Sequence, residues 1–178
     1  MTTVPLDIRN VRIVLLSDHD WLAGFDSGEA EIDRNIARCC ERHAAYRART
    51  FCAVSEQHQG ACGFYTFGIS AHDSKYLSEE LIRANEGRAF VPFVYLSYLA
   101  VRKPLQNQKI GTLLLAHALS RCAQVVREVG GVYGVALHAL TDRAAGLYDR
   151  YGFREYGQRT RYPFMILPAQ SLIELTSN

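Results

Sequence analysis

The chain has 178 residues, 48% of them hydrophobic, and a net charge of +2. A chain of this length can bury one sizeable core, so we expect a single domain over residues 1–178. No apolar run approaches the ~18 residues that cross a bilayer and no secretory signal pattern is seen, so we expect a cytoplasmic protein with no membrane partner. The five cysteines form no CxxC pair and are interpreted as small buried hydrophobes, which excludes a disulfide framework or a zinc knuckle.

The first half of the chain has patterns typical of strands, one long helix and a loop. In chain order they predict a strand at 11–17, a helix from Asp26 to about Arg47, an antiparallel strand pair at 50–56 and 61–70, and a polar loop at 71–90 with a short helix at about 78–85. The strands are short β-branched and aromatic runs, and the long helix has apolar side chains at three- and four-residue steps. Gly60 supplies turn chemistry between the paired strands.

The second half alternates strands with helices. The patterns predict a buried strand at 90–101, a helix that contains Leu113 to Val125 and ends at Gly130 and Gly131, a strand at 132–140, a short helix capped by Thr141 or Asp142 and ended by Gly152, and a closing hairpin over 154–167. Antiparallel pairs followed by strand-helix-strand units predict an α/β fold, with a mixed, mostly antiparallel sheet and helices on both faces.

A single glycine lies where the buried strand passes into the next helix, in the stretch LQNQKIGTLLLAHAL at 105–119. Free N–H groups at a helix start, reinforced by the helix dipole, can bind a phosphate, and Gly111 would let the backbone come close to it. Lys103 and Lys109 would add positive charge. The alternative is an ordinary loop-to-helix turn with solvated lysines, and this stretch by itself does not decide between the two.

The wider arrangement resembles the GNAT N-acetyltransferases, which carry a Gln/Arg-x-x-Gly-x-Gly/Ala motif between a strand and a helix. In YLAVRKPLQNQKIGTLLLAHAL, Gln106, Lys109 and Gly111 occupy the defined positions, so a lysine replaces the first glycine. The lysine would either crowd the pyrophosphate of the coenzyme or bind it through its ammonium group. AAGLYDRYGF, after one further strand, resembles the family's next motif.

The front half resembles the branch of this family that includes bacterial toxin acetyltransferases. The segments FDSGEAEIDRNI, RTFCAV and GFYTFGIS extend the resemblance to nearly the whole chain. Ser27 stands where that branch often has cysteine, and it is interpreted as part of a helix start. Ser97 and Tyr98 stand where the branch often has a small residue followed by arginine.

The resemblance implies acetyl-CoA as cosubstrate and gives roles to particular residues. The end of the buried strand would serve the pantetheine arm and the thioester, and the loop after it the pyrophosphate. The strand end that would contact the pantetheine arm and the thioester is formed by Leu99, Ala100 and Val101. The loop residues that would contact the pyrophosphate are Gln106, Asn107, Gln108, Lys109, Ile110 and Gly111. Tyr148 resembles the family's general acid, because a phenol with a pKa near 10 can protonate the departing thiolate. The alternative for Tyr148 is a packing aromatic with a surface hydroxyl.

No general base or metal site is evident. His138 and Asp142 follow or end a predicted strand on the acceptor side, but a lone histidine is more often structural. Water could remove the proton, because an α-amine with a pKa near 8 is already substantially neutral at physiological pH.

The acceptor stays open at this point. Toxins of the resembled branch acetylate the α-amine of aminoacyl-tRNA and are neutralised by a small DNA-binding antitoxin, so the resemblance implies such a partner and allows a homodimer. The alternatives are an acetyltransferase for a small-molecule amine or a protein N-terminus, and a non-catalytic acyl-CoA sensor, for which Lys109 is the best argument.

Arginines recur along the first predicted helix. Arg34, Arg38 and Arg42 are spaced by four residues, and Arg47 and Arg49 follow. They would form either a track for RNA phosphates or a solvated face paired with glutamates of the same helix, Glu31 and Glu41.

Overall fold

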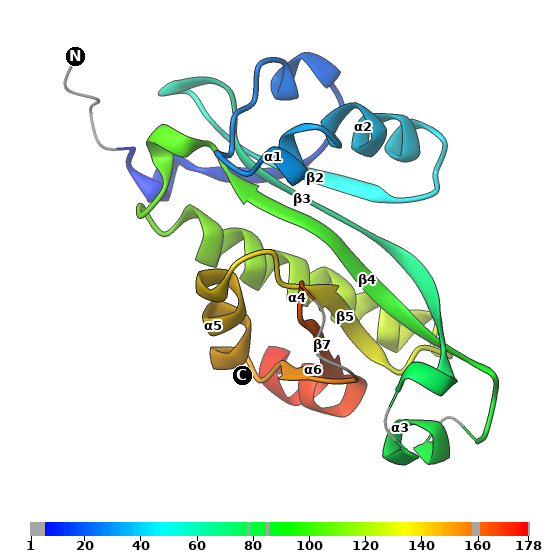
Figure 1. Cartoon of the computed structure of the whole chain (residues 1–178). Helices are drawn as coiled ribbons and strands as arrows, with labels where there is room; N and C mark the ends of the chain where they lie inside the picture. The colour runs from blue at the N-terminus through cyan, green and yellow to red at the C-terminus, as the bar shows by residue number, and fades with distance from the viewer. Residues whose placement is uncertain (1–5, 78, 85, 158–160, 178) are drawn as a thin grey trace. The chain divides into compact units, whose positions relative to one another are not determined.

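The computed structural model describes residues 6–77, 79–84, 86–157 and 161–177. The strands are β1 (Arg12–Leu15), β2 (Arg49–Ser55), β3 (His58–Asp73), β4 (Phe90–Val101), β5 (Gly134–His138), β6 (Arg154–Glu155) and β7 (Phe164–Pro168) (Figure 1). The helices are α1 (Ala30–Asp33), α2 (Ile36–Ala44), α3 (Glu79–Ala84), α4 (Ile110–Glu128), α5 (Asp142–Arg150) and α6 (Ala169–Thr176). None of the described helices has the length and apolarity to cross a membrane.

The strands are hydrogen-bonded in the order β1-β2-β3-β4-β5-β7-β6. The β4–β5 pair is parallel, whereas the β1–β2, β2–β3, β5–β7 and β6–β7 pairs are antiparallel. The predicted α/β fold with a mixed, mostly antiparallel sheet is therefore confirmed. The chain divides into two compact units, residues 1–68 with 97–118 and residues 69–96 with 119–178. The assignment of all 178 residues to a single domain stays a prediction.

In the first unit, helices cover both faces of β2 and β3. Thr50 and Thr66 are paired in register with their hydroxyls 2.9 Å apart, and the Thr50 N–H donates to His43 Nδ1 of α2 at 3.1 Å. Tyr65 points to the opposite face because neighbouring strand residues alternate. Its hydroxyl lies 2.8 Å from His117 Nδ1 of α4. The alternating pattern thus gives each face of this pair its own helix.

The second unit has its own apolar core. It is formed by buried residues of α3, β4, β5, β7 and the turn before α3: Leu77, Leu81, Val91, Phe93, Ala136 and Ile166. The parallel pairing of β4 with β5 is short, with Val94 opposite Val135 and Tyr95 opposite Ala136. Helix α6 packs on β5 and β7. The sequence analysis did not predict α6.

The long helix predicted from Asp26 to Arg47 is wrong, because two short helices take its place. The break falls at Asn35, which has φ −101° and ψ 3°. Its side-chain amide donates to the Glu31 carbonyl at 2.7 Å, and such local bonds compete with the helical pattern. The predicted loop at 71–90 is also shorter than expected, because β3 continues to Asp73. Its short helix is present as α3, and residues 78 and 85 lie outside the described part.

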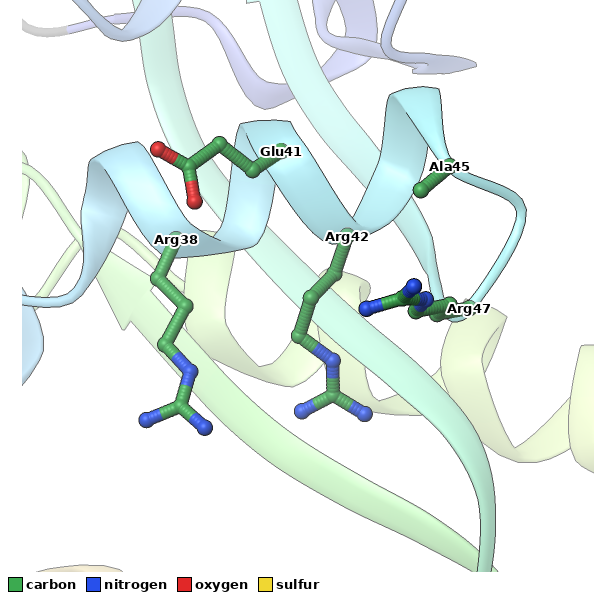
Figure 2. Close-up of a pocket in the computed structure, with 5 residues that line it drawn as sticks. All are labelled: Arg38, Glu41, Arg42, Ala45 and Arg47. Carbon is green, nitrogen blue, oxygen red and sulfur yellow. The ribbon is translucent and has the colours of Figure 1, made fainter.

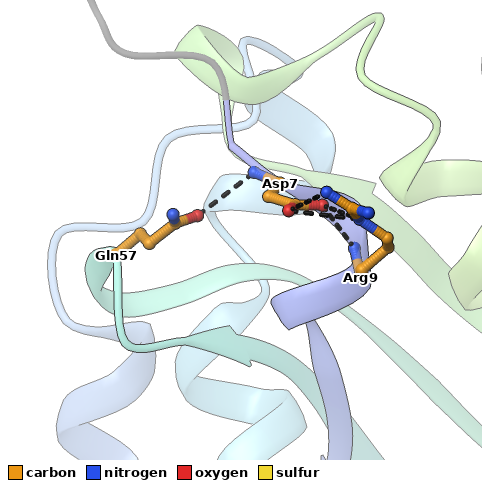
Figure 3. Close-up of polar contacts among 3 residues, drawn as sticks. All are labelled: Asp7, Arg9 and Gln57. Atoms are coloured by element: carbon orange, nitrogen blue, oxygen red, sulfur yellow. Dashed lines mark hydrogen bonds and ion pairs between the residues drawn. The ribbon is translucent and has the colours of Figure 1, made fainter.

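The segment before β1 is anchored at its backbone (Figure 3). The Asp7 carboxylate accepts hydrogen bonds from the Arg9 backbone N–H at 3.0 Å and from its guanidinium at 2.8 Å. The Asp7 N–H donates to the Gln57 side-chain oxygen at 3.1 Å, in the turn between β2 and β3. Because Arg9 is 86% exposed, its ion pair adds little stability. Of these three bonds, the one to Gln57 joins parts that are distant in sequence.

Candidate active site

The predicted coenzyme residues follow one another at the end of β4 and the start of α4. Leu99, Ala100 and Val101 end β4, a 3-10 turn and a short loop follow, and α4 begins at Ile110. β3 closely approaches both elements at Gly63, where an added Cβ would lie 2.7 Å from the Ala100 oxygen and 2.8 Å from a methyl of Leu114. Glycine at this position therefore lets the sheet fix the end of β4 against α4.

The loop before α4 has an unusual backbone. Asn107 and Lys109 have φ values of +66° and +64°, in the left-handed region that glycine adopts freely. Asparagine tolerates this region better than most residues, whereas a lysine there costs about 1 kcal/mol. Lys109 stands where the resembled motif has glycine. The chain thus keeps the glycine-like backbone although it has lost the glycine.

The first turn of α4 presents N–H groups that have no partner within the helix. These belong to residues 110–112, because the N–H of Leu113 is the first to bond back, to the Lys109 carbonyl at 3.1 Å. A Cβ added to Gly111 would meet only a methyl of Val101, at 3.6 Å. The protein itself therefore has room for a side chain at this position. Unpaired N–H groups, the helix dipole and open space together suit the diphosphate of a coenzyme.

Two glutamines of the loop use their side chains to hold it in place. The Gln106 amide donates to the Ser27 carbonyl at 2.8 Å and to the Val101 carbonyl at 3.2 Å. The Gln108 side-chain oxygen accepts from the Leu6 N–H at 3.0 Å. Both residues therefore position the loop through their side chains, which leaves the backbone of the loop to meet a ligand.

The segment at 24–28, which contains FDSG, forms hydrogen bonds with the residues that lead into the same loop. The Lys103 N–H donates to the Asp26 carbonyl at 2.8 Å, and the Arg102 guanidinium donates to the Gly24 carbonyl at 2.9 Å. Arg102 also lies over the Phe25 ring, 4.9 Å from its centroid. The sequence analysis missed this role of Arg102. The segment at 24–28, near the start of the toxin-branch motif, thus contacts residues 102–106, at the start of the coenzyme-loop motif.

Ser27 lies two residues before Glu29, the N-cap of α1, and does not itself cap this helix. It is buried, its hydroxyl donates to the Asp33 carboxylate at 2.7 Å, and it accepts from the Glu29 N–H at 3.1 Å. These bonds join the segment before α1 to the helix itself.

Tyr148 lies in the second unit on α5, which begins as predicted at a Thr141 cap that accepts from the Ala144 N–H at 3.1 Å. Only 7% of Tyr148 is exposed, and its ring lies 5.7 Å from that of Phe153. Burial raises the pKa of Tyr148 to about 12. The phenol is therefore protonated throughout the physiological range and can act as a proton donor. Within the described chain, no residue hydrogen-bonds to its hydroxyl.

His138 is held by a neighbour. Its Nδ1 lies 2.6 Å from the Tyr95 hydroxyl, and its ring lies 5.0 Å from that of Phe164. Burial lowers the pKa of His138, which favours the neutral imidazole. The geometry matches the structural histidine that the sequence analysis considered the more common case. Asp142, the other acceptor-side candidate, is exposed in the first turn of α5.

A family model described as an acetyltransferase (GNAT) domain matches residues 47–155, more than half of the chain. The chain belongs to the GNAT acetyltransferase family. The matched range contains β4, the loop before α4 and α5, and thus every residue to which the sequence analysis gave a coenzyme-binding or general-acid role. The roles of these individual residues remain predictions.

Known GNAT relatives resemble this chain over most of its length. A protein of Mycobacterium tuberculosis described as a tRNA-acetylating toxin is 31% identical over 141 residues, which cover 78% of this chain and 81% of that protein. The structure of AtaT complexed with acetyl-methionyl-tRNAfMet has a TM-score of 0.78 and 24% identity, over 94% of this chain and 99% of that one. A tyrosine-to-phenylalanine mutant of the AtaT toxin, bound to the C-terminus of the antitoxin AtaR and acetyl-CoA, has a TM-score of 0.74 and 23% identity, over 95% and 99%.

The arginines of this GNAT acetyltransferase only partly form the predicted track. Arg34 pairs with Glu31 at 3.1 Å, as the solvated-face alternative expects. Arg38 and Arg42 point their guanidinium groups to the same side of α2, and Arg47 is turned toward Arg42 (Figure 2). These three residues, with Glu41 and Ala45, line a hollow of about 340 Å³. We call this the arginine hollow.

The three guanidinium groups of the arginine hollow are available to a ligand. Among the described residues, none forms an ion pair with Arg38, Arg42 or Arg47. Figure 2 shows the Glu41 carboxylate on the side of α2 away from them. Arg38 and Arg42 also act electrostatically on Tyr98 of β4, whose pKa burial raises. The hollow therefore lies close to the strand that carries the predicted thioester residues.

Proposed function

We propose that this protein transfers the acetyl group of acetyl-CoA to the α-amine of an aminoacyl-tRNA in the cytoplasm. The observation that carries the proposal is the 31% identity, over most of both chains, to a protein described as a tRNA-acetylating toxin. The loop before α4 supports the donor part, because it retains the glycine-like backbone at Lys109 and the unpaired N–H groups of residues 110–112. That retained backbone also weakens the case for a sensor that has lost catalysis.

In the proposed reaction, the neutral amine attacks the thioester carbonyl carbon, so a C–N bond forms and the C–S bond breaks. The end of β4, Leu99 to Val101, would align the thioester, and residues 106–111 would hold the diphosphate. The amine loses one proton to water, directly or through a neighbouring group. Tyr148 gives one proton to the departing thiolate and regains it from solvent. A phenol whose pKa is raised to about 12 is in the protonated state that this step needs.

We also propose an antitoxin as protein partner, since solved relatives of this fold include a toxin bound to its antitoxin. The arginine hollow would bind RNA phosphates, because three guanidinium groups without a described carboxylate partner attract a polyanion. An acetyltransferase for a small amine would need no such surface.

The test is acetyl transfer from labelled acetyl-CoA to charged tRNA, with uncharged tRNA and a panel of small amines as matched acceptors. We expect label in charged tRNA alone. Tyr148→Phe should lower kcat by roughly 100-fold or more, with acetyl-CoA binding nearly unchanged. Transfer to small amines but not to charged tRNA would replace the proposed acceptor. Binding of acetyl-CoA without any turnover would favour the sensor.

A further inference from the structure

Tyr46 is the most exposed large hydrophobic side chain in the described chain, at 79%. It follows the last turn of α2 and has a φ of +58°. Its N–H donates to the His43 carbonyl at 3.1 Å, and the Arg47 N–H donates to the Arg42 carbonyl at 2.9 Å. These two bonds form a Schellman motif, in which the residue at the position of Tyr46 has a left-handed backbone and is usually glycine.

The fold does not explain a tyrosine at this position. A bulky residue with positive φ is a backbone outlier, and the ring here recovers no stability through burial. Glycine would close the same motif without strain. A strained residue that the structure holds in place and exposes is the kind found at binding sites.

The surroundings of Tyr46 indicate what it binds. The guanidinium carbon of Arg49 lies 4.7 Å from the centroid of the Tyr46 ring, so one face of the ring is covered by a cation. The high exposure leaves the other face open. The residues directly before and after Tyr46, Ala45 and Arg47, line the arginine hollow. An exposed aromatic residue thus lies in the chain between two residues that line the arginine hollow.

We propose that Tyr46 is a stacking platform for a base of an RNA ligand, and that Arg38, Arg42 and Arg47 bind the adjoining phosphates. This inference rests on the proposed tRNA acceptor. Every base has a π-face, so stacking on an aromatic ring adds affinity without demanding a sequence. The arginines supply the salt-dependent part of the affinity. Arg49, on the far face, holds the ring in place and completes a guanidinium–ring–base stack.

RNA fits this surface better than an acidic protein segment does. Carboxylates would satisfy the guanidinium groups of the arginine hollow, but they would leave the open face of Tyr46 unused. An unpaired nucleotide brings both a phosphate and a planar base. The charge of the hollow and the ring beside it are therefore both used by one ligand.

The experiment measures binding of two polyanions of matched charge, a short single-stranded RNA and inorganic polyphosphate, to four forms of the full chain. These are the wild type, Tyr46→Gly, Tyr46→Phe and Glu86→Gly. Glu86 has a φ of +56° and is exposed, so Glu86→Gly relieves a similar backbone strain at another place. It also removes one negative charge and the ion pair with Arg88, so it cannot weaken polyanion binding through charge.

We expect Tyr46→Gly to weaken RNA binding by roughly 5- to 150-fold, the range for loss of one stacked base, and to leave polyphosphate binding unchanged. Its Tm should stay level or rise by about 2–4 °C, because the strain is relieved. Tyr46→Phe should bind both polyanions like the wild type, and Glu86→Gly should bind neither more weakly than the wild type does. A Tm that does not fall keeps the result interpretable, because weaker binding cannot then come from unfolding.

RNA binding by Tyr46→Gly that equals the wild type would overturn the inference. An equal loss for RNA and polyphosphate would also overturn it, in favour of a surface for acidic protein segments. Neither readout needs turnover. A wild type that binds RNA through Tyr46 but does not acetylate charged tRNA would therefore refute the proposed function and leave the stacking platform in place.

Discussion

Replacing Lys109 with glycine tests whether the lysine binds the coenzyme or merely occupies the place of a glycine. Lys109 has a φ of +64° and is exposed. Lys109→Gly relieves this backbone strain, but glycine also has more conformational entropy in the unfolded chain. The difference between the two effects should stabilise the protein by about 0.5–1 kcal/mol. In a chain of this size, that corresponds to a rise in Tm of roughly 1–4 °C. The rise is expected without coenzyme and is measured by thermal unfolding of the free protein.

Acetyl-CoA affinity should move in the opposite direction. An exposed ammonium beside a diphosphate adds a modest, salt-sensitive contact, so Lys109→Gly should raise Kd by roughly twofold to fivefold at low salt. Lys109→Gln is the matched control, because it removes the charge and keeps a side chain in the left-handed region. It should weaken binding by a similar factor and leave Tm unchanged. Calorimetric titration of both variants separates the charge from the backbone.

Two results would refute this reasoning. Tighter acetyl-CoA binding by Lys109→Gly would mean that the lysine obstructs the diphosphate. An unchanged Kd in both variants would mean that the Lys109 side chain does not contact the diphosphate.

Three further predictions follow from burial and close packing. The pKa of Tyr148 is about 12 in the folded chain and near 10 in the unfolded chain. The stability that comes from keeping this phenol protonated is therefore present below pH 10 and is lost as the pH rises toward 12. In denaturant unfolding, Tyr148→Phe should show a smaller loss of stability over this pH range. Gly63→Ala places a Cβ 2.7 Å from the Ala100 oxygen and should lower Tm strongly, whereas Gly111→Ala, at 3.6 Å from its neighbour, should leave Tm nearly unchanged. The pKa of His138 is lowered in the folded chain, so as the pH falls the unfolded state binds a proton at this histidine before the folded state does. Stability should therefore fall as the pH drops below about 6.5, and it should fall less in His138→Gln. A Tm that does not change with acid would contradict this.

The sequence predicted best those elements that local pattern determines. β4 has the predicted bounds, residues 90–101, because a nearly continuous apolar run between polar segments leaves little choice. The Thr141 cap and the turn at Gly152, with φ +89°, likewise follow from the chemistry of single residues. The predicted coenzyme residues lie together because they are consecutive along the chain.

The missed features depend on contacts that are distant in sequence or on single dihedral angles. Gln108 bonds to the backbone of Leu6, which is 102 positions away, and no local pattern indicates such a pair. Tyr46 closes a motif that is usually recognised by glycine, so its left-handed backbone was invisible in the sequence. The break at Asn35 arises because one side-chain amide takes a helical carbonyl, which apolar periodicity does not reveal.

The way in which the loop before α4 is held bears on selectivity. Since the side chains of Gln106 and Gln108 are bonded to the protein itself, we expect the loop to contact a diphosphate through backbone N–H groups and the Lys109 ammonium. The diphosphate is common to acetyl-CoA, to longer acyl-CoA thioesters and to the free CoA that the reaction releases. This part of the site therefore cannot discriminate among acyl groups or reject the product. We expect free CoA to compete with the donor, so that the enzyme slows as the cellular ratio of acetyl-CoA to CoA falls.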